Sequence, residues 1–217
     1  MKRYIIVIFI FLAIQVQSQE LFRPSHSIKV DMGLPASQGN KPYKFIMQGL
    51  FNVSTYYQYS LPFGLNFGAG GNFNYFTINE FRIPGMVSGG IATLGGFGKL
   101  GYERFFTPKI ATDFGVKFGY SYSFSNNTRT KELIGKAHTY DAPYIEPMVN
   151  LYLMADEQNG FSLSVGYVFR GVKFNETHLM IDEITGYEPK DFGGITHFLI
   201  VGFGYTYYIG KKSQTTN

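Results

Sequence analysis

Charged residues are sparse in the body of this chain, and their positions alternate with those of aromatic and aliphatic residues. A lone charge held away from water is costly, whereas opposite charges that lie close together can pair. Four basic and four acidic residues share the small, polar side of their segments, so their spacing predicts that they pair with one another. Arg170 is expected near the middle of this network. Its predicted members are Lys29, Asp31, Lys99, Glu103, Asp113, Lys117, Glu146 and Arg170.

A glycine motif is the next candidate for chemistry. Gly96, Gly98 and Gly101 match the G-x-G-x-x-G pattern of dinucleotide sites, which requires a helix directly after the glycines. Here a strand-like alternation continues through the motif. The match therefore predicts no nucleotide site, and the glycines are expected to relieve crowding or let a strand bend.

The four histidines give no complete site. His138 and His178 fall near Asp141 and Asp182 in loop-like segments. A loop metal site is one interpretation of this grouping, and solvated loop histidines are the simpler one. We predict no catalytic residue, no metal and no cofactor.

The segment from 110 to 124, IATDFGVKFGYSYSF, shows what positions the charges. Its even positions are mostly aromatic or aliphatic, and its odd positions are small or charged. A β-strand points successive side chains to opposite faces, so this is a two-faced strand. At about 3.3 Å per residue and a tilt near 45°, roughly 11 residues cross a hydrocarbon layer. The segment is long enough to do so.

Seven further segments show similar alternation, and no segment has a convincing helical period. In the second, Met47, Phe51 and Val53 are predicted to share the apolar face. The links between segments are alternately short and long, which is typical of outer-membrane barrels. The fold class predicted is all-β: an eight-stranded antiparallel up-and-down transmembrane β-barrel. Its expected strands are 27–34, 45–60, 63–75, 90–103, 110–124, 143–154, 161–174 and 195–209.

The two faces differ in volume, and this decides which of them points outward. A soluble eight-stranded binding barrel would place its apolar face inside. The interior of such a barrel is just wide enough for its own side chains, and the apolar face here is too bulky to fit. We therefore predict that the apolar face meets lipid and that the charged network plugs the lumen. A thin water-filled passage lined by the same charges is the alternative.

Tyrosines near the strand ends support the membrane interpretation. Amphipathic rings collect at the two membrane–water boundaries, although tyrosine also favours strands for other reasons. The predicted interface residues are Tyr57, Tyr59, Tyr75, Tyr120, Tyr122, Tyr205 and Tyr207.

The N-terminus predicts export. Lys2 and Arg3 precede an apolar run from 4 to 14, which is too short for a spanning helix and typical of a secretory signal peptide. We expect a cleaved signal over 1–19, the barrel over 20–210 and a polar periplasmic tail over 211–217. Without the signal, the chain has 17 basic and 15 acidic residues. This small positive net charge is too weak to indicate nucleic-acid binding. The chain has no cysteine, which excludes disulfides and thiolate chemistry.

The glutamine-rich end of the signal, the eight alternating strands and the terminal YTYYIG resemble small outer-membrane β-barrel proteins of Gram-negative bacteria. The likeness is greatest to the porin-family or "outer membrane protein β-barrel" type common in Bacteroidota, and it covers about Ser27 to Gly210. The resemblance implies an outer-membrane location with both termini in the periplasm. Many such barrels end on an aromatic residue that the insertion machinery reads. Here Lys211–Asn217 follow, so that signal would lie around Phe203 to Ile209.

The function expected from these observations is a non-enzymatic structural or surface-interaction role. Expected partners are outer-membrane lipid, lipopolysaccharide and an envelope protein that binds the surface loops. Four acidic residues in the last loop could hold a divalent cation against lipopolysaccharide, and four solvated carboxylates are the simpler interpretation. A narrow porin-like channel is the second hypothesis. A lipopolysaccharide-modifying enzyme is the third, but His197 has no serine two residues away on its own strand. The acidic loop residues are Asp182, Glu183, Glu188 and Asp191.

Overall fold

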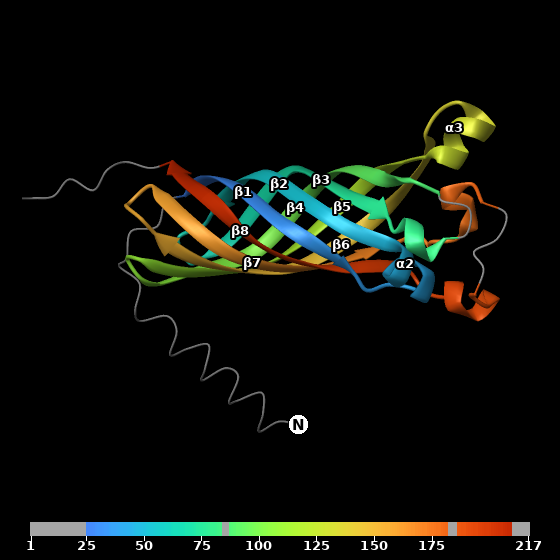
Figure 1. Cartoon of the computed structure of the whole chain (residues 1–217). Helices are drawn as coiled ribbons and strands as arrows, with labels where there is room; N and C mark the ends of the chain where they lie inside the picture. The colour runs from blue at the N-terminus through green and yellow to red at the C-terminus, as the bar shows by residue number, and fades with distance from the viewer. Residues whose placement is uncertain (1–24, 84–86, 182–185, 210–217) are drawn as a thin grey trace, which may run out of the picture.

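The computed structural model describes residues 25–83, 87–181 and 186–209. Eight antiparallel strands follow one another around a closed barrel, and β8 pairs with β1 to complete it (Figure 1). The predicted eight-stranded up-and-down barrel is confirmed. The predicted signal peptide and the polar tail lie outside the described residues. The strands are β1 (His26–Ser37), β2 (Met47–Ser60), β3 (Leu65–Ile78), β4 (Gly89–Thr107), β5 (Ile110–Asn127), β6 (His138–Met154), β7 (Asn159–Arg170) and β8 (Thr196–Ile209).

The links between strands define two different ends of the barrel. Those at 61–64, 108–109 and 155–158 are short, and we call their side the turn end. Those at 38–46, 79–88, 128–137 and 171–195 are longer, and their side is the loop end. β1 begins and β8 ends at the turn end. The alternation expected from the sequence is therefore present, although β6 starts at His138 and turns part of one expected loop into strand.

Short helices gather at the loop end (Figure 1). They are α2 (Lys41–Ile46), α3 (Thr128–Ile134) and the 3-10 turns η1 (Glu80–Arg82), η2 (Glu176–Leu179) and η3 (Pro189–Phe192). The Asn40 side chain caps α2 by accepting the Tyr43 backbone N–H at 3.0 Å. Helices of six or seven residues are too short to show a period, which is why the sequence did not indicate them. In the part of the chain that the structure describes, no helix has the length and hydropathy needed to span a membrane.

A β-bulge in β2 reverses which face its first residues use. The register with β3 shifts between Gly49 and Phe51, so Leu50 is an extra residue. Beyond the bulge Phe51 faces outward as predicted, but Met47 points inward and is 1% exposed. The prediction that Met47 shares a face with Phe51 is wrong, because a single inserted residue moves every preceding side chain to the other face.

The barrel interior changes character along its length. Towards the turn end it holds the charged side chains together with asparagine, glutamine and serine. A small apolar cluster of Phe105, Ala111, Tyr152, Met154 and Tyr208 also lies at that end. Towards the loop end the interior becomes apolar, because inward residues of the strands pack against residues of α2 and the loops. We call this group the loop-end core. Its main members are Tyr43, Ile46, Met47, Phe76, Ile78, Ile83, Val87, Ile91, Val168, Phe174, Leu179 and Phe198. The alternation in the sequence predicts a small, polar inner face throughout and does not indicate this core.

Candidate functional site

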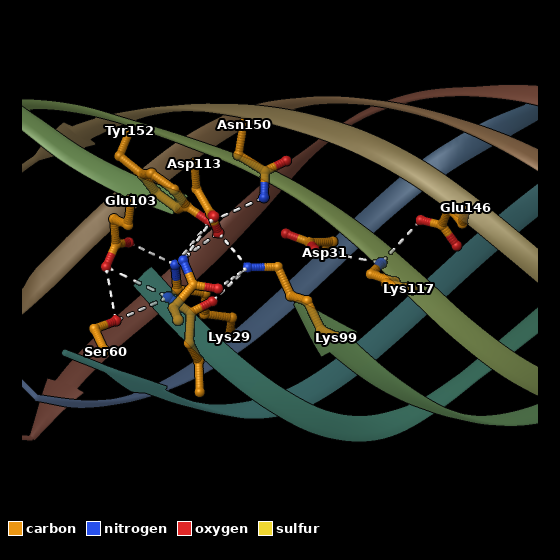
Figure 2. Close-up of polar contacts among 12 residues, drawn as sticks. Lys29, Asp31, Ser60, Lys99, Glu103, Asp113, Lys117, Glu146, Asn150 and Tyr152 are labelled. Carbon is orange, nitrogen blue, oxygen red and sulfur yellow. Dashed lines mark hydrogen bonds and ion pairs between the residues drawn. The ribbon is translucent and has the colours of Figure 1, made fainter. Parts of the chain in front are cut away.

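Four charged side chains meet inside the barrel near the turn end, and we call them the four-charge cluster (Figure 2). Lys29 comes from β1, Lys99 and Glu103 from β4, and Asp113 from β5. The Lys29 Nζ lies 2.7 Å from Glu103 Oε1 and 3.3 Å from Asp113 Oδ2, and the Lys99 Nζ lies 2.7 Å from the same Asp113 oxygen. All four are buried. Inward alternation thus brings β1 charges together with those of β4 and β5 across the lumen, although these strands are not neighbours of β1.

Both lysines of the cluster use all three of their N–H donors. The third donor of Lys29 reaches the Tyr152 hydroxyl at 3.1 Å. Lys99 donates to Gln58 Oε1 at 2.6 Å and Asn66 Oδ1 at 2.9 Å, in addition to Asp113. A lysine ammonium has three donors and no acceptor, so neither ammonium group retains a spare proton that would need water.

The two carboxylates are equally well supplied with donors. Glu103 accepts from the Tyr208 hydroxyl at 2.8 Å and from Ser60 at 3.2 Å, besides Lys29. The other oxygen of Asp113 accepts from Asn66 Nδ2 at 3.1 Å. Buried ion pairs stabilise a fold only when further hydrogen bonds satisfy their remaining donors and acceptors. This cluster meets that condition.

A second group lies further towards the loop end and forms the three-charge cluster. Its members are Lys117 of β5, Glu146 of β6 and Asp31 of β1 (Figure 2). The Lys117 Nζ lies 2.9 Å from Glu146 Oε1 and 4.0 Å from Asp31 Oδ2. It also lies 5.1 Å from the centre of the Phe97 ring and 5.4 Å from that of Tyr56, distances at which a cation is attracted to an aromatic face.

Arg170 is not in the middle of the network, and that prediction is wrong. It is the last residue of β7, opposite Tyr144 and next to the loop-end core. Its guanidinium reaches Thr93 Oγ1 and Asn74 Oδ1, each at 3.4 Å, and it lies 5.6 Å from the Phe198 ring centre. Among the described residues no ion pair joins it to a carboxylate. Alternation predicts its inward face, but its depth depends on where β7 ends. The sequence pattern predicts that end at about Phe174, whereas β7 ends at Arg170.

The neutral residues that complete the four-charge cluster were not among the predicted site residues. Tyr208 lies on the even, inward face of β8, whereas the outward tyrosines of β8 are odd-numbered. Gln58 and Asn66 likewise lie on inward positions of β2 and β3. Alternation alone identifies these faces. Alternation does not give the inter-strand register, which determines which residues lie at the same depth in the barrel.

The predicted interface tyrosines all lie on the outer wall, in two groups. One group is near the turn end and the other near the loop end. Six are about 39–57% exposed, and Tyr75 is partly buried. Between the groups, the outer wall carries exposed leucine, valine, isoleucine and phenylalanine. The turn-end group is Tyr57, Tyr59, Tyr205 and Tyr207, and the loop-end group is Tyr75, Tyr120 and Tyr122.

The histidines lie apart from the charged interior. His197 is on the outer side of β8, where its ring Nδ1 lies 2.5 Å from the Tyr167 hydroxyl. His178 packs edge-on against Tyr140, with ring centres 4.3 Å apart. Burial, and then the neighbouring His138, lower the pKa of His178 to about 4. Within residues 25–83, 87–181 and 186–209, no group of three or more histidine, aspartate or glutamate side chains is arranged to hold a metal. The G-x-G-x-x-G glycines all lie within β4, which continues to Thr107.

No family model matches the chain, and no curated protein sequence does. Solved structures share its fold. Neisserial surface protein A has a TM-score of 0.56 at 7% identity, over 85% of this chain and 97% of its own. The outer membrane protein OprG from Pseudomonas aeruginosa has a TM-score of 0.51 at 11% identity, over 88% of this chain and all of its own (100%). At these identities the likeness concerns the fold alone. The chain thus has the eight-stranded barrel fold that these two bacterial envelope proteins share.

Proposed function

We propose that this protein is an outer-membrane barrel of a Gram-negative bacterium with a closed lumen and a non-enzymatic role at the cell surface. The outer wall supports the membrane location. Phe114, Phe118 and Leu163 are each more than half exposed, and they belong to an apolar band bounded by tyrosines at both ends. An outward apolar band between aromatic girdles is the pattern of barrels that span a membrane.

The single observation that best supports a closed lumen is that the two lysines of the four-charge cluster have no unused N–H donor. Ammonium groups that line a water-filled passage keep donors free for water, whereas Lys29 and Lys99 have each used all three. The loop-end core supports the same conclusion at the opposite end, where Phe76 and Phe198 pack edge-on inside the barrel. Ion pairs and an apolar core together favour a scaffold over a porin-like channel.

The loops are the proposed functional surface. We infer that the turn end, with both termini, lies in the periplasm and that the loop end faces outside. There Phe81 is fully exposed and Leu133 of α3 is 64% exposed, beside charged residues such as Lys131. Exposed apolar groups rimmed by charge are typical of interaction sites. Lipopolysaccharide and an envelope protein are the proposed partners, and co-purification from detergent-solubilised outer membrane would identify the latter.

Planar-bilayer conductance tests the closed lumen. The chain has no cysteine, so a Lys136→Cys variant labelled with a fluorophore would show that each membrane contains inserted barrels. The expected result is that labelled membranes carry no steady current. A sustained open pore in those membranes would contradict the proposal and would favour the narrow porin-like channel.

A further inference from the structure

Arg170 is a buried cation whose donors are incompletely used. Its side chain is 4% exposed. A guanidinium has five N–H donors, yet those of Arg170 make two hydrogen bonds, both at the long distance of 3.4 Å. Its Nε has no partner in the described structure. Glu146 lies two residues from Tyr144, which is opposite Arg170 in the register. Its Oε1 pairs with Lys117, and its Oε2 has no hydrogen-bond partner in the described structure, so it does not bind Arg170 either.

A small cavity adjoins Arg170 beneath the loops. Its volume is about 10 Å³, which is room for about one particle the size of a water molecule. The wall combines residues of β7, β8 and α2 with apolar side chains such as Phe76 and Phe174. The cavity is therefore too small for a carboxylate, a sulfate or a phosphate group.

Two further hydroxyl groups of the cavity wall lack partners. The Tyr43 hydroxyl and the Thr196 Oγ1 are buried and form no hydrogen bond in the described part of the chain. Burial raises the pKa of Tyr43 well above its usual range, so this hydroxyl stays protonated and can donate. His178 also lines the cavity, and its lowered pKa leaves it neutral at physiological pH. No aspartate or glutamate is among the described residues that line this cavity.

We propose that this cavity is a binding site for a single halide ion, physiologically chloride, held by the Arg170 guanidinium and the Tyr43 and Thr196 hydroxyls. A buried cation beside unused donors favours an acceptor that also carries negative charge. The three-charge cluster has one more carboxylate than ammonium, but neither of its carboxylates lines this cavity. A water molecule could accept from two of these donors but would bring no negative charge next to Arg170. The ion would join β7, β8 and α2, and would thereby fasten the loop-end core to the barrel wall.

Anomalous diffraction from crystals of the protein grown in sodium bromide tests the site directly. The expected result is an anomalous peak inside the cavity, within hydrogen-bonding distance of Arg170 Nε and the Tyr43 hydroxyl. An ordered water without anomalous signal, an empty cavity, or bromide at other positions alone would overturn the proposal.

Thermal unfolding of the detergent-solubilised protein tests the site in solution. Sodium chloride would be exchanged for sodium gluconate at constant ionic strength, since gluconate is too large for the cavity. A ligand that binds only the folded state raises the unfolding temperature with its concentration. We expect a saturable chloride-dependent rise that Arg170→Gln abolishes and that Arg82→Gln, which alters an exposed loop arginine, preserves. Equal unfolding temperatures in chloride and gluconate would contradict the site.

Tyr43→Phe keeps the buried ring but removes one donor, so it provides a test even if Arg170→Gln does not fold. It should weaken the apparent chloride affinity by ~10-fold, the usual effect of one hydrogen bond to a charged group. An unchanged chloride dependence in a folded Tyr43→Phe protein would contradict the proposed site, because the Tyr43 hydroxyl is one of its three ligands.

Discussion

Asp113 is the residue on which the four-charge cluster depends most. One of its oxygens binds both lysines, and the other accepts the Asn66 amide. Removing one partner of a buried ion pair leaves an uncompensated charge, which costs more than the pair itself contributes. The position of Asp113 opposite Glu103 in the β4–β5 register also means that Lys29 must separate two carboxylates.

Asp113→Asn should therefore lower the free energy of unfolding by about 3–5 kcal/mol, because Lys29 and Lys99 each lose a charged acceptor. Urea unfolding in lipid vesicles measures this change. Glu132→Gln is the matched control, since Glu132 forms an exposed ion pair with Arg129 at 3.2 Å. Exposed pairs contribute little, so the control should stay within about 0.5 kcal/mol of the natural protein. Equal losses in both variants would show that the cluster is not the stabilising feature.

At the scale of the element, the bulge in β2 sets which side chains enter the loop-end core. It turns Met47 inward while Phe51 and the following alternate residues stay outward. Gly49 allows β2 to lie against Pro35 of β1. A Cβ atom at position 49 would be 1.9 Å from the Pro35 carbonyl oxygen, which is backbone and cannot move aside easily.

Gly49→Ala should destabilise the barrel by roughly 1–3 kcal/mol, as overpacking usually does. Gly96→Ala is the control, because a Cβ atom there meets nothing within 4 Å. It should leave the stability unchanged or raise it by up to about 1 kcal/mol, since alanine restricts the unfolded chain. Denaturant midpoints of the two variants provide the comparison. Equal midpoints would show that β2 and β1 are not in close contact at Gly49 and Pro35.

The loop-end core should also respond to acid through His178. The folded pKa is about 4 and the ordinary value is 6.5, chiefly because the ring is buried. Between these values the unfolded chain binds a proton that the folded chain does not, so stability is full above pH 6.5 and declines as the pH falls towards 4. His178→Gln should remove this part of the decline. Unfolding temperatures of the natural protein and of His178→Gln, measured across this pH range, test this prediction. Parallel curves for the two proteins would show that the ring is solvated.

The strands could be predicted from the sequence, whereas the bulge, α2 and the depth of Arg170 could not. Alternation with period two identified all eight strands and the inward face of each charged residue, because lipid and a narrow lumen impose opposite demands on the two faces. Alternation could not identify the bulge at Leu50, because one inserted residue leaves the local amino-acid composition unchanged. It also missed α2, because this helix is six residues long and its burial depends on residues distant in sequence. The depth of Arg170 was missed for a related reason, since it depends on where β7 ends.

At the scale of the whole molecule, the barrel has an apolar outer wall. Its interior has a charged section between a small apolar cluster at the turn end and the larger loop-end core. The outer wall follows from composition, since no eight-stranded lumen could hold so many aromatic rings. The composition at each depth of the interior follows from register, which for example places Asp31 between Gly204 of β8 and Ser54 of β2. We infer that hydrocarbon, and not water, contacts the outer wall.

Single tryptophans and brominated lipids test this claim most directly, because the natural chain has no tryptophan. Phe118 of β5 is 52% exposed on the outer wall, whereas Phe97 of β4 is 6% exposed inside the barrel. The register places them at nearly the same depth, since Phe97 pairs with Gly119. In vesicles whose lipids carry bromine near the bilayer centre, Phe118→Trp fluorescence should be strongly quenched and Phe97→Trp fluorescence should not. Quenching of Phe97→Trp with no effect on Phe118→Trp would contradict the account.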